Sequence, residues 1–131
     1  MRQVTYISTV RQDHRADMFR SVERVSQANN ARDALSGLLM FDGMRFLQVI
    51  EGPEPALSAT LDRIRADGRH FGLVVLTDRA VEERAFGGWA MLCRDVKGEG
   101  DLVAMLRPFL AGADPNTRAT FQSFAAIRDA A

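Results

Sequence analysis

Residues 2–10 alternate between two faces, one of which carries Tyr6 among apolar neighbours, and β-branched side chains are frequent there. This pattern predicts a strand. Apolar residues then recur three or four positions apart, which predicts a helix that begins at Asp13 or His14. The pair Asn29-Asn30 is expected to end this helix, because asparagine tolerates the left-handed conformation found at helix C-termini.

Two apolar segments on either side of Asp42-Gly43 predict a β-hairpin. They cover residues 37–41 and 46–51, and Asp-Gly between apolar segments is a strong signal for a tight turn. Pro53 and Pro55 follow the hairpin. They are expected to begin a second helix, because the N–H groups of a first helical turn have no partner within the helix.

The second helix is expected to end at Asp67-Gly68, and two more strands are predicted after it. Residues 71–77 form the fourth strand, and its uninterrupted apolar run at 73–76 indicates that neither face is exposed to solvent. Residues 89–94 form the fifth strand.

This order of elements predicts an α+β fold of the ferredoxin-like type. A βαββαββ chain builds a mixed sheet with two helices on one face, and its helical crossovers are right-handed. The composition changes near residue 98, and two further helical stripes follow. We therefore expect a first domain at residues 1–97 and a C-terminal two-helix extension at residues 98–131.

Length and charge narrow the classes of function. The chain has 131 residues, 17 Lys and Arg against 17 Asp and Glu, and thus no formal net charge. A neutral chain is not steered onto nucleic acid or an anionic membrane, so neither is an expected partner. The single cysteine, Cys93, fits a reducing compartment. Because a signal peptide and a spanning apolar segment are both missing, we expect a cytoplasmic protein.

The common catalytic and metal-binding motifs are absent from the sequence. Two histidines, His14 and His70, and one cysteine do not make a zinc site from this chain. Cys93 paired with His70 as a nucleophile would require that the two residues be adjacent in space. The simpler interpretation of Cys93 is a small buried side chain in a strand.

Polar residues at predicted core positions are better candidates for a site. Gln48 and Tyr6 both lie in the middle of predicted strands, and a buried amide must find hydrogen-bonding partners. Either Gln48 faces solvent, or both side chains point toward the helices and share a ligand. Asn30 is either the C-cap of its helix or part of the same site.

A further polar group gathers where the second helix ends, and it consists of Arg63, Asp67, Arg69 and His70. It is either a solvated helix end, where basic residues are favourable, or part of a binding site. Trp89 and Met91 share one face of the predicted fifth strand and could flank that site.

The chain resembles the BLUF domain, the flavin-binding blue-light sensor of bacteria, over residues from about Thr5 to Arg94. The resemblance rests on six segments in a fixed order: residues 6–8 (YIS), 26–30 (SQANN), 36–39 (SGLL), 46–52 (FLQVIEG), 67–70 (DGRH) and 84–91 (RAFGGWAM). It implies a noncovalently bound flavin, usually FAD, with FMN tolerated in some members.

The resemblance also implies roles for single residues. Tyr6 is implied as the electron and proton donor to the photoexcited ring, and Gln48 as the amide that bridges Tyr6 to the flavin N5 and O4 edge. Asn30 is implied to bind the O4/N3 edge, and Ser26 lies one helical turn before it.

Four more positions are implied to lie around the flavin. Arg63 matches a position that reaches the O2 edge in some members, and Asp67 and His70 match positions that line the ring or the ribityl chain. Trp89 and Met91 match a pair that exchange places near the flavin in different structures of the family.

The expected function is therefore a blue-light photoreceptor that is not an enzyme. One alternative is a flavin or small-ligand binding module without photochemistry. A hydrolase of the acylphosphatase type would need a glycine-rich anion loop, which residues 11–14 do not provide. We expect the signal to leave through contact with a downstream protein. The helical extension would cap the open sheet face, and part of its surface is either shared in a homo-oligomer or covered within one chain.

Overall fold

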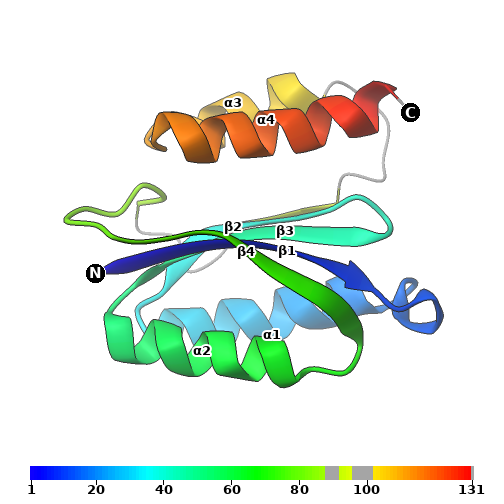
Figure 1. Ribbon diagram of the computed structural model, residues 1–131, viewed down its shortest axis with the longest axis horizontal. Helices are drawn as coiled ribbons and strands as arrows, with labels where there is room; N and C mark the ends of the chain where they lie inside the picture. The colour runs from blue at the N-terminus through cyan, green and yellow to red at the C-terminus, as the bar shows by residue number, and fades with distance from the viewer. Residues whose placement is uncertain (88–91, 96–101, 131) are drawn as a thin grey trace.

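The computed structural model describes residues 1–87, 92–95 and 102–130 in three layers. A sheet lies in the middle, helices α1 (Met18–Arg32) and α2 (Glu54–Ala66) cover one face, and α3 (Leu102–Leu110) and α4 (Pro115–Ala130) cover the other (Figure 1). The predicted α+β fold class, with its C-terminal helices, is confirmed. The boundary proposed at residue 97 falls outside the described residues and stays a prediction.

The sheet has five strands in the order β4-β1-β3-β2-β5. The first four are antiparallel to their neighbours, and β5 runs parallel to β2, so that the sheet is mixed. The strands are β1 (Arg2–Val10), β2 (Ser36–Phe41), β3 (Arg45–Gly52), β4 (His70–Ala80) and β5 (Leu92–Asp95). In the register of β1 on β3, Tyr6 lies opposite Gln48.

Helix α1 begins and ends later than the sequence predicts. Residues 12–14 form a short 3-10 turn, η1 (Gln12–His14), and the α-helix starts only at Met18. At the other end the helix runs on to Arg32, and Ala34 takes the left-handed conformation, with φ of 58°. The Leu35 N–H then bonds the Asn30 carbonyl, 2.8 Å away, which closes the helix end. The expectation that Asn29-Asn30 ends the helix is therefore wrong.

Strand β4 is also not buried on both faces, contrary to the prediction from its apolar run. It is an edge strand, and its side chains alternate between partly buried and exposed, with Val74 and Leu76 exposed. Leu73 and Val75 pack toward α2, whereas the core under α3 and α4 is built on β2 and β3. A continuous apolar sequence thus lies on a strand with only one covered face.

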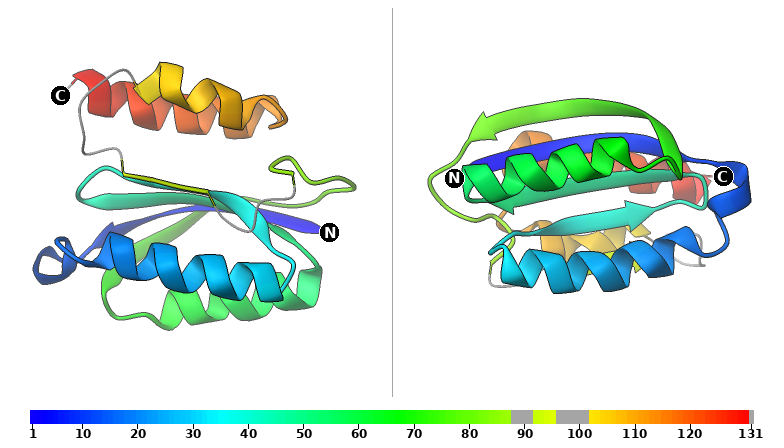
Figure 2. Two further views of the ribbon diagram at one scale, coloured as in Figure 1. Left: turned by 180° about the vertical axis from the view of Figure 1, so that it is seen from behind. Right: turned by 90° about the horizontal axis from the view of Figure 1, so that it is seen from below.

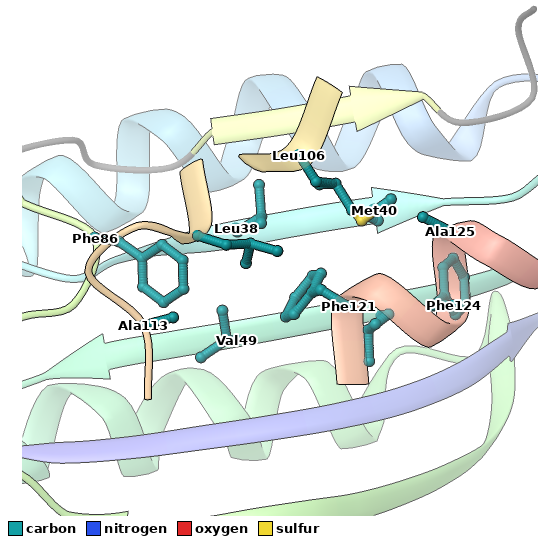
Figure 3. Packing of buried hydrophobic residues seen from close by; sticks show 11 residues of the cluster. Leu38, Met40, Val49, Phe86, Leu106, Ala113, Phe121, Phe124 and Ala125 are labelled. Carbon is teal, nitrogen blue, oxygen red and sulfur yellow. The ribbon is translucent and has the colours of Figure 1, made fainter. Parts of the chain in front are cut away.

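The two C-terminal helices pack on the sheet through an apolar cluster (Figure 3). Phe121 of α4 is fully buried above Val49 of β3, and Leu106 of α3 lies over Leu38 and Met40 of β2. Pro115 begins α4, as the sequence predicts. Leu106, Phe121 and Phe124 of the predicted apolar stripes are thus buried within the chain, whereas Ile127 of α4 is exposed.

Candidate functional site

A cavity of about 200 Å³ lies between α1, α2 and the sheet. Figure 2 shows the two helices side by side beneath the sheet. Seven of the nine residues that the sequence predicts as a site line this cavity: Tyr6, Ser26, Asn30, Gln48, Arg63, Asp67 and His70. Trp89 and Met91 fall outside the described residues.

Helix α1 packs on the sheet mainly through its first half. Met18 is buried, and Phe19 and Val22 contact the cluster around Phe41 and Phe46. Farther along the helix, Asn30 alone is buried, and the side chains that face the sheet line the cavity instead. The second half of α1 therefore borders a space that no protein core fills.

Tyr6 and Gln48 join neighbouring strands across the wall of the cavity. Both are 3% exposed, and the Tyr6 hydroxyl donates a hydrogen bond to Gln48 Oε1. Since alternate residues of a strand point to opposite faces, the pairing of Tyr6 with Gln48 places both side chains on the face covered by α1 and α2. The alternative in which Gln48 faces solvent is therefore wrong.

Asn30 presents an amide to the cavity from inside α1. It is 3% exposed, and among the described residues no group forms a hydrogen bond with its side chain. Its helix continues for two more residues, so Asn30 is not a C-cap. A buried amide costs free energy when its donors and acceptor are unpaired. This position is consequently well suited to a ligand with a polar edge.

Asp67 and Arg69 form the most strongly bonded ion pair at the cavity. Asp67 accepts hydrogen bonds from Arg69 Nη2 at 2.7 Å and from the Arg69 backbone N–H at 3.0 Å. These bonds hold the pKa of Asp67 below its usual range, although partial burial acts in the opposite direction. Arg69 Nη1 also bonds Ser21 of α1 at 3.2 Å. The end of α2 is thereby tied to α1 at the cavity's rim.

His70 and Arg63 lie at the same end but differ in environment. His70 is buried, and its Nε2 lies 2.6 Å from the Ile64 carbonyl while Nδ1 lies 2.8 Å from Ser8 Oγ. A carbonyl only accepts, so Nε2 donates the hydrogen bond to Ile64, and Nδ1 shares a hydrogen bond with the Ser8 hydroxyl. Arg63 is half exposed and pairs with Asp33 at 3.6 Å. The solvated helix end is thus a wrong interpretation for His70.

With both ring nitrogens engaged, His70 offers the cavity only the face or edge of its ring. Its bonds to Ser8 and Ile64 fix β4 against β1 and α2. The side chain of Cys93 lies outside the described part, so neither interpretation of Cys93 is tested.

Sequence reasoning missed the apolar lining of the cavity and the polar residues Asn29 and Thr60. It placed Arg69 in the polar group at the end of the second helix but not in the predicted site. The apolar lining residues are Met18, Val22, Val25, Phe46 and Ile64. Their helical members had the ordinary signature of a core stripe. One signal in the sequence could have identified them. Ser26, Asn29 and Asn30 continue the same helical face, and a face that changes from apolar to polar side chains is poorly suited to a core and indicates a binding site.

Comparison with known proteins identifies the family. The family model described as "BLUF: Sensors of blue-light using FAD" matches residues 1–92. The chain belongs to the BLUF family. It is 28% identical over 92 residues to the "Blue light- and temperature-regulated antirepressor BluF" of Escherichia coli (strain K12), a match that covers 70% of this chain and 23% of that relative. The chain thus spans about a quarter of the relative's length.

Solved structures of other BLUF proteins have the same fold. BlrB, described as "a BLUF protein, dark state structure", matches with a TM-score of 0.74 and 28% identity over 96% of both chains. "Klebsiella pneumoniae BlrP1 with FMN and cyclic diGMP, no metal ions" matches with a TM-score of 0.78 and 28% identity, covering 97% of this chain and 34% of that chain. The resemblance seen in the sequence is confirmed.

The cavity of this BLUF chain fits a flavin by the chemistry of its walls. An isoalloxazine has an apolar body and a polar edge of acceptors with one imide N–H. Apolar side chains from α1, α2 and β3 line the cavity, and the amides of Asn30 and Gln48 face it together with Tyr6. The unpartnered amide of Asn30 is the observation that favours such an edge most directly.

Among the described residues, no three His, Cys, Asp or Glu side chains converge as ligands for a metal ion. In the same part of the chain, no helix is both long and apolar enough to cross a lipid bilayer.

Proposed function

We propose that this BLUF chain is a blue-light photoreceptor that uses Tyr6 and Gln48 as its switch and passes its signal on through protein contact. The hydrogen bond from the Tyr6 hydroxyl to Gln48 Oε1, buried at the cavity wall, supports this mechanism most directly. We further propose FAD as the bound flavin. FMN is an alternative, because a related BlrP1 structure contains it.

Flavin, when bound, supplies the absorption of blue light and an acceptor for one electron. Tyr6 is suited to donate that electron, because its phenol, with a pKa of about 10 in water, becomes far more acidic once oxidised. The phenolic proton then has a path to Gln48, whose Oε1 already accepts the hydrogen bond. Asn30 holds the polar edge of the ring, and the apolar side chains of α1 exclude water from it.

Gln48 can reverse its hydrogen bonds with little change in volume. Its two terminal groups are nearly equal in size but opposite in hydrogen-bonding sense. Rotation or tautomerisation of the amide would therefore exchange which partner donates and which accepts. A new donor at the flavin O4 edge would shift the absorption to longer wavelength.

We propose that the output is a contact with another protein and that the chain itself catalyses no reaction. The E. coli relative is described as an antirepressor, which supports an output of this kind. In this proposal the side chains that line the cavity bind and tune the flavin.

An absorption spectrum before and after blue light tests the proposal. We expect a yellow protein whose flavin band shifts reversibly to the red. In Tyr6→Phe and in Gln48→Leu the flavin should stay bound while the shift disappears, because the donor or the reversible amide is lost. Ser123→Ala, an exposed change on α4, serves as a control and should behave as wild type.

Two outcomes would contradict the proposal. A bound flavin without any light-induced change in the wild-type protein would support the alternative, a binding module without photochemistry. A normal red shift in both Tyr6→Phe and Gln48→Leu would leave the photoreceptor but remove its proposed mechanism.

A further inference from the structure

Glu51 is a fully buried carboxylate on the side of the sheet opposite the flavin cavity. It lies in β3 three residues after Gln48, with a side-chain exposure of 0%. Because side chains alternate along a strand, Gln48 faces α1 and α2 whereas Glu51 faces the layer of α3 and α4. One strand thus carries the proposed switch on one face and a buried charge on the other.

Four donors converge on this carboxylate. Oε1 accepts from Ser36 Oγ at 3.1 Å and from the Phe86 N–H at 2.8 Å. Oε2 accepts from Gln3 Nε2 at 3.1 Å and from the Ala85 N–H at 2.9 Å. The donors come from β1, β2 and the connection after β4, so a single group holds three separate segments to β3. Burial of a carboxylate is costly unless it is bonded in this way.

Two arginines extend the chain of contacts outward. Arg84 donates to Ser36 Oγ at 2.9 Å and to the Ala34 carbonyl, just beyond the end of α1, at 2.6 Å. Arg79 donates to Gln3 Oε1 at 3.1 Å and pairs with Asp114 at 2.8 Å.

Asp114 lies just before α4, on the same face of the sheet as Glu51. Its carboxylate accepts hydrogen bonds from the backbone N–H groups of Asn116 and Thr117. The network therefore runs from the C-terminal end of α1, through Glu51, to the N-terminal end of α4.

The segment held by Glu51 also touches the α3–α4 turn. A Cβ atom placed on Gly112 would lie 2.7 Å from the Ala85 carbonyl, so the two backbones are in close contact. Phe86 packs in the same cluster as Ala113 and Phe121, and Figure 3 shows it beside Ala113. Movement of Ala85 and Phe86 relative to β3 must therefore disturb the turn that joins α3 to α4.

We propose that Glu51 is a positioning residue that transmits the light state from β3 to the α3–α4 layer. The inference rests on the function proposed above, because the event it transmits is the rearrangement at Gln48. A shift of β3 at Gln48 changes the geometry of all four bonds to Glu51 together. Ala85, Phe86 and Asp114 then move with Glu51. A downstream protein that binds the outer surface of α3 and α4 would thereby distinguish the light state from the dark state.

The backbone N–H groups of Ala85 and Phe86 provide a direct readout. Both are bonded to Glu51, so their hydrogen exchange, measured by NMR, reports the opening of those bonds. In the wild-type protein we expect illumination to change the exchange of these two amides and of residues 112–117. The light-minus-dark difference is the measured quantity, because a purely structural role would alter both states equally.

Glu51→Gln tests the proposal at its centre. Whichever way the new amide turns, its NH₂ group faces two donors, so half of the junction is lost. We expect flavin to stay bound and the red shift to persist, while the light-minus-dark difference at residues 85–86 and 112–117 is lost. Glu82→Gln, the same change at an exposed position of the same connection, should leave both readouts as in wild type.

Arg79→Met provides a second variant in case Glu51→Gln does not fold. It removes the bonds to Gln3 and Asp114 but leaves the carboxylate and its four donors in place. We expect this variant to keep the light-induced difference at Ala85 and Phe86 and to weaken it at Asn116 and Thr117.

Several results would overturn the inference. One is a wild-type red shift without any light-induced difference in exchange at residues 85–86 and 112–117. Another is the full difference retained in Glu51→Gln or, where that variant does not fold, retained at residues 116–117 in Arg79→Met. Loss of the red shift itself in Glu51→Gln would place Glu51 in the photochemistry and contradict a transmitting role. Absence of a red shift in the wild-type protein would instead contradict the proposed function.

Discussion

At the scale of single residues, the site combines side chains that are already bonded with one that is not. Tyr6 and Gln48 bond each other, and both nitrogens of His70 are engaged by Ser8 and Ile64. Asn30 faces the cavity without such a bond among the residues that the structure describes. Its contribution to protein stability and its contribution to flavin binding are therefore separable.

We expect Asn30→Ala to weaken flavin binding without destabilising the flavin-free protein. Loss of one or two hydrogen bonds costs about 1–3 kcal/mol, which raises the Kd by roughly 5-fold to 150-fold. The flavin-free variant should melt at the wild-type temperature or above it, because an unpaired buried amide is removed. Fluorescence titration with FMN and thermal unfolding measure the two effects.

Asn116→Ala is the matched control, since Asn116 is exposed at the start of α4. It should leave the flavin Kd unchanged. An unchanged Kd in Asn30→Ala would remove this residue from the proposed binding site.

At the scale of elements, the two helices under the sheet differ in how they are held. Helix α2 buries Leu57, Thr60 and Leu61 along its length, whereas α1 buries only Met18 and Asn30. The C-terminal half of α1 is instead held at its end, by Arg63 with Asp33 and by Arg84 with the Ala34 carbonyl. Because α1 is held mainly at its two ends, the space between α1, α2 and the sheet has room for a planar ligand.

Helix α4 depends on Asp114 at its N-terminus, and this cap gives a prediction with a defined pH dependence. The Asp114 carboxylate bonds the N–H groups of Asn116 and Thr117. Burial alone would raise the pKa of Asp114, but bonds from Thr117 and the charge of Arg79 outweigh it and hold the pKa below its usual range. We expect Asp114→Ala to lower the free energy of unfolding at pH 7 by about 0.5–2 kcal/mol, the range found for helix N-caps.

The sign of the pH effect follows from the lowered pKa. The stabilisation is fully present above the unfolded-state pKa of about 4 and is lost as the pH falls through the lower folded-state value. Denaturant titrations of wild type and Asp114→Ala should therefore converge in strong acid. A difference that stays constant down to the lowest pH at which the protein folds would contradict the capping role.

At the scale of the whole molecule, the sheet is covered on both faces by helices of different origin. The layer formed by α1 and α2 leaves a cavity. The layer formed by α3 and α4 makes a filled core with β2 and β3 (Figure 3). The exposed apolar side chains that remain include Phe71, Val74 and Leu76 on the edge strand β4. Ile127 of α4 is exposed as well.

We expect removal of residues 98–131 to cause aggregation. The truncation uncovers Leu38, Met40, Leu47 and Val49, which are all fully buried in the intact chain, and a contiguous apolar patch of this kind promotes association. Size-exclusion chromatography with light scattering, on the full chain and the truncated one, measures the masses. A truncated chain that stays soluble and monomeric would contradict the capping role of the extension.

The same measurement addresses self-association. A full chain that elutes as a dimer would support the prediction that part of the outer surface is shared between copies, and a monomer would contradict it.

Several of the secondary-structure elements follow from the sequence alone, because they depend on residues that are close together in the chain. Three local signals were enough to predict β1, the β2–β3 hairpin and α2, because turns and strand faces depend on near neighbours. They are the alternation along residues 2–10, the turn at Asp42-Gly43, and Pro53 and Pro55 at the start of α2. Segments that match the BLUF family were enough to predict seven of the side chains that line the cavity, and that these side chains bind a flavin stays a prediction.

Tertiary structure decided what those side chains do. An apolar run on β4 and an asparagine pair in α1 look the same in sequence whether they are buried, exposed or capping a helix. Their environment depends on which strand lies at the edge and which helix face meets a cavity. The junction at Glu51 is of this kind, since its donors come from β1, β2 and the β4–β5 connection. Only the packed sheet brings them to one carboxylate.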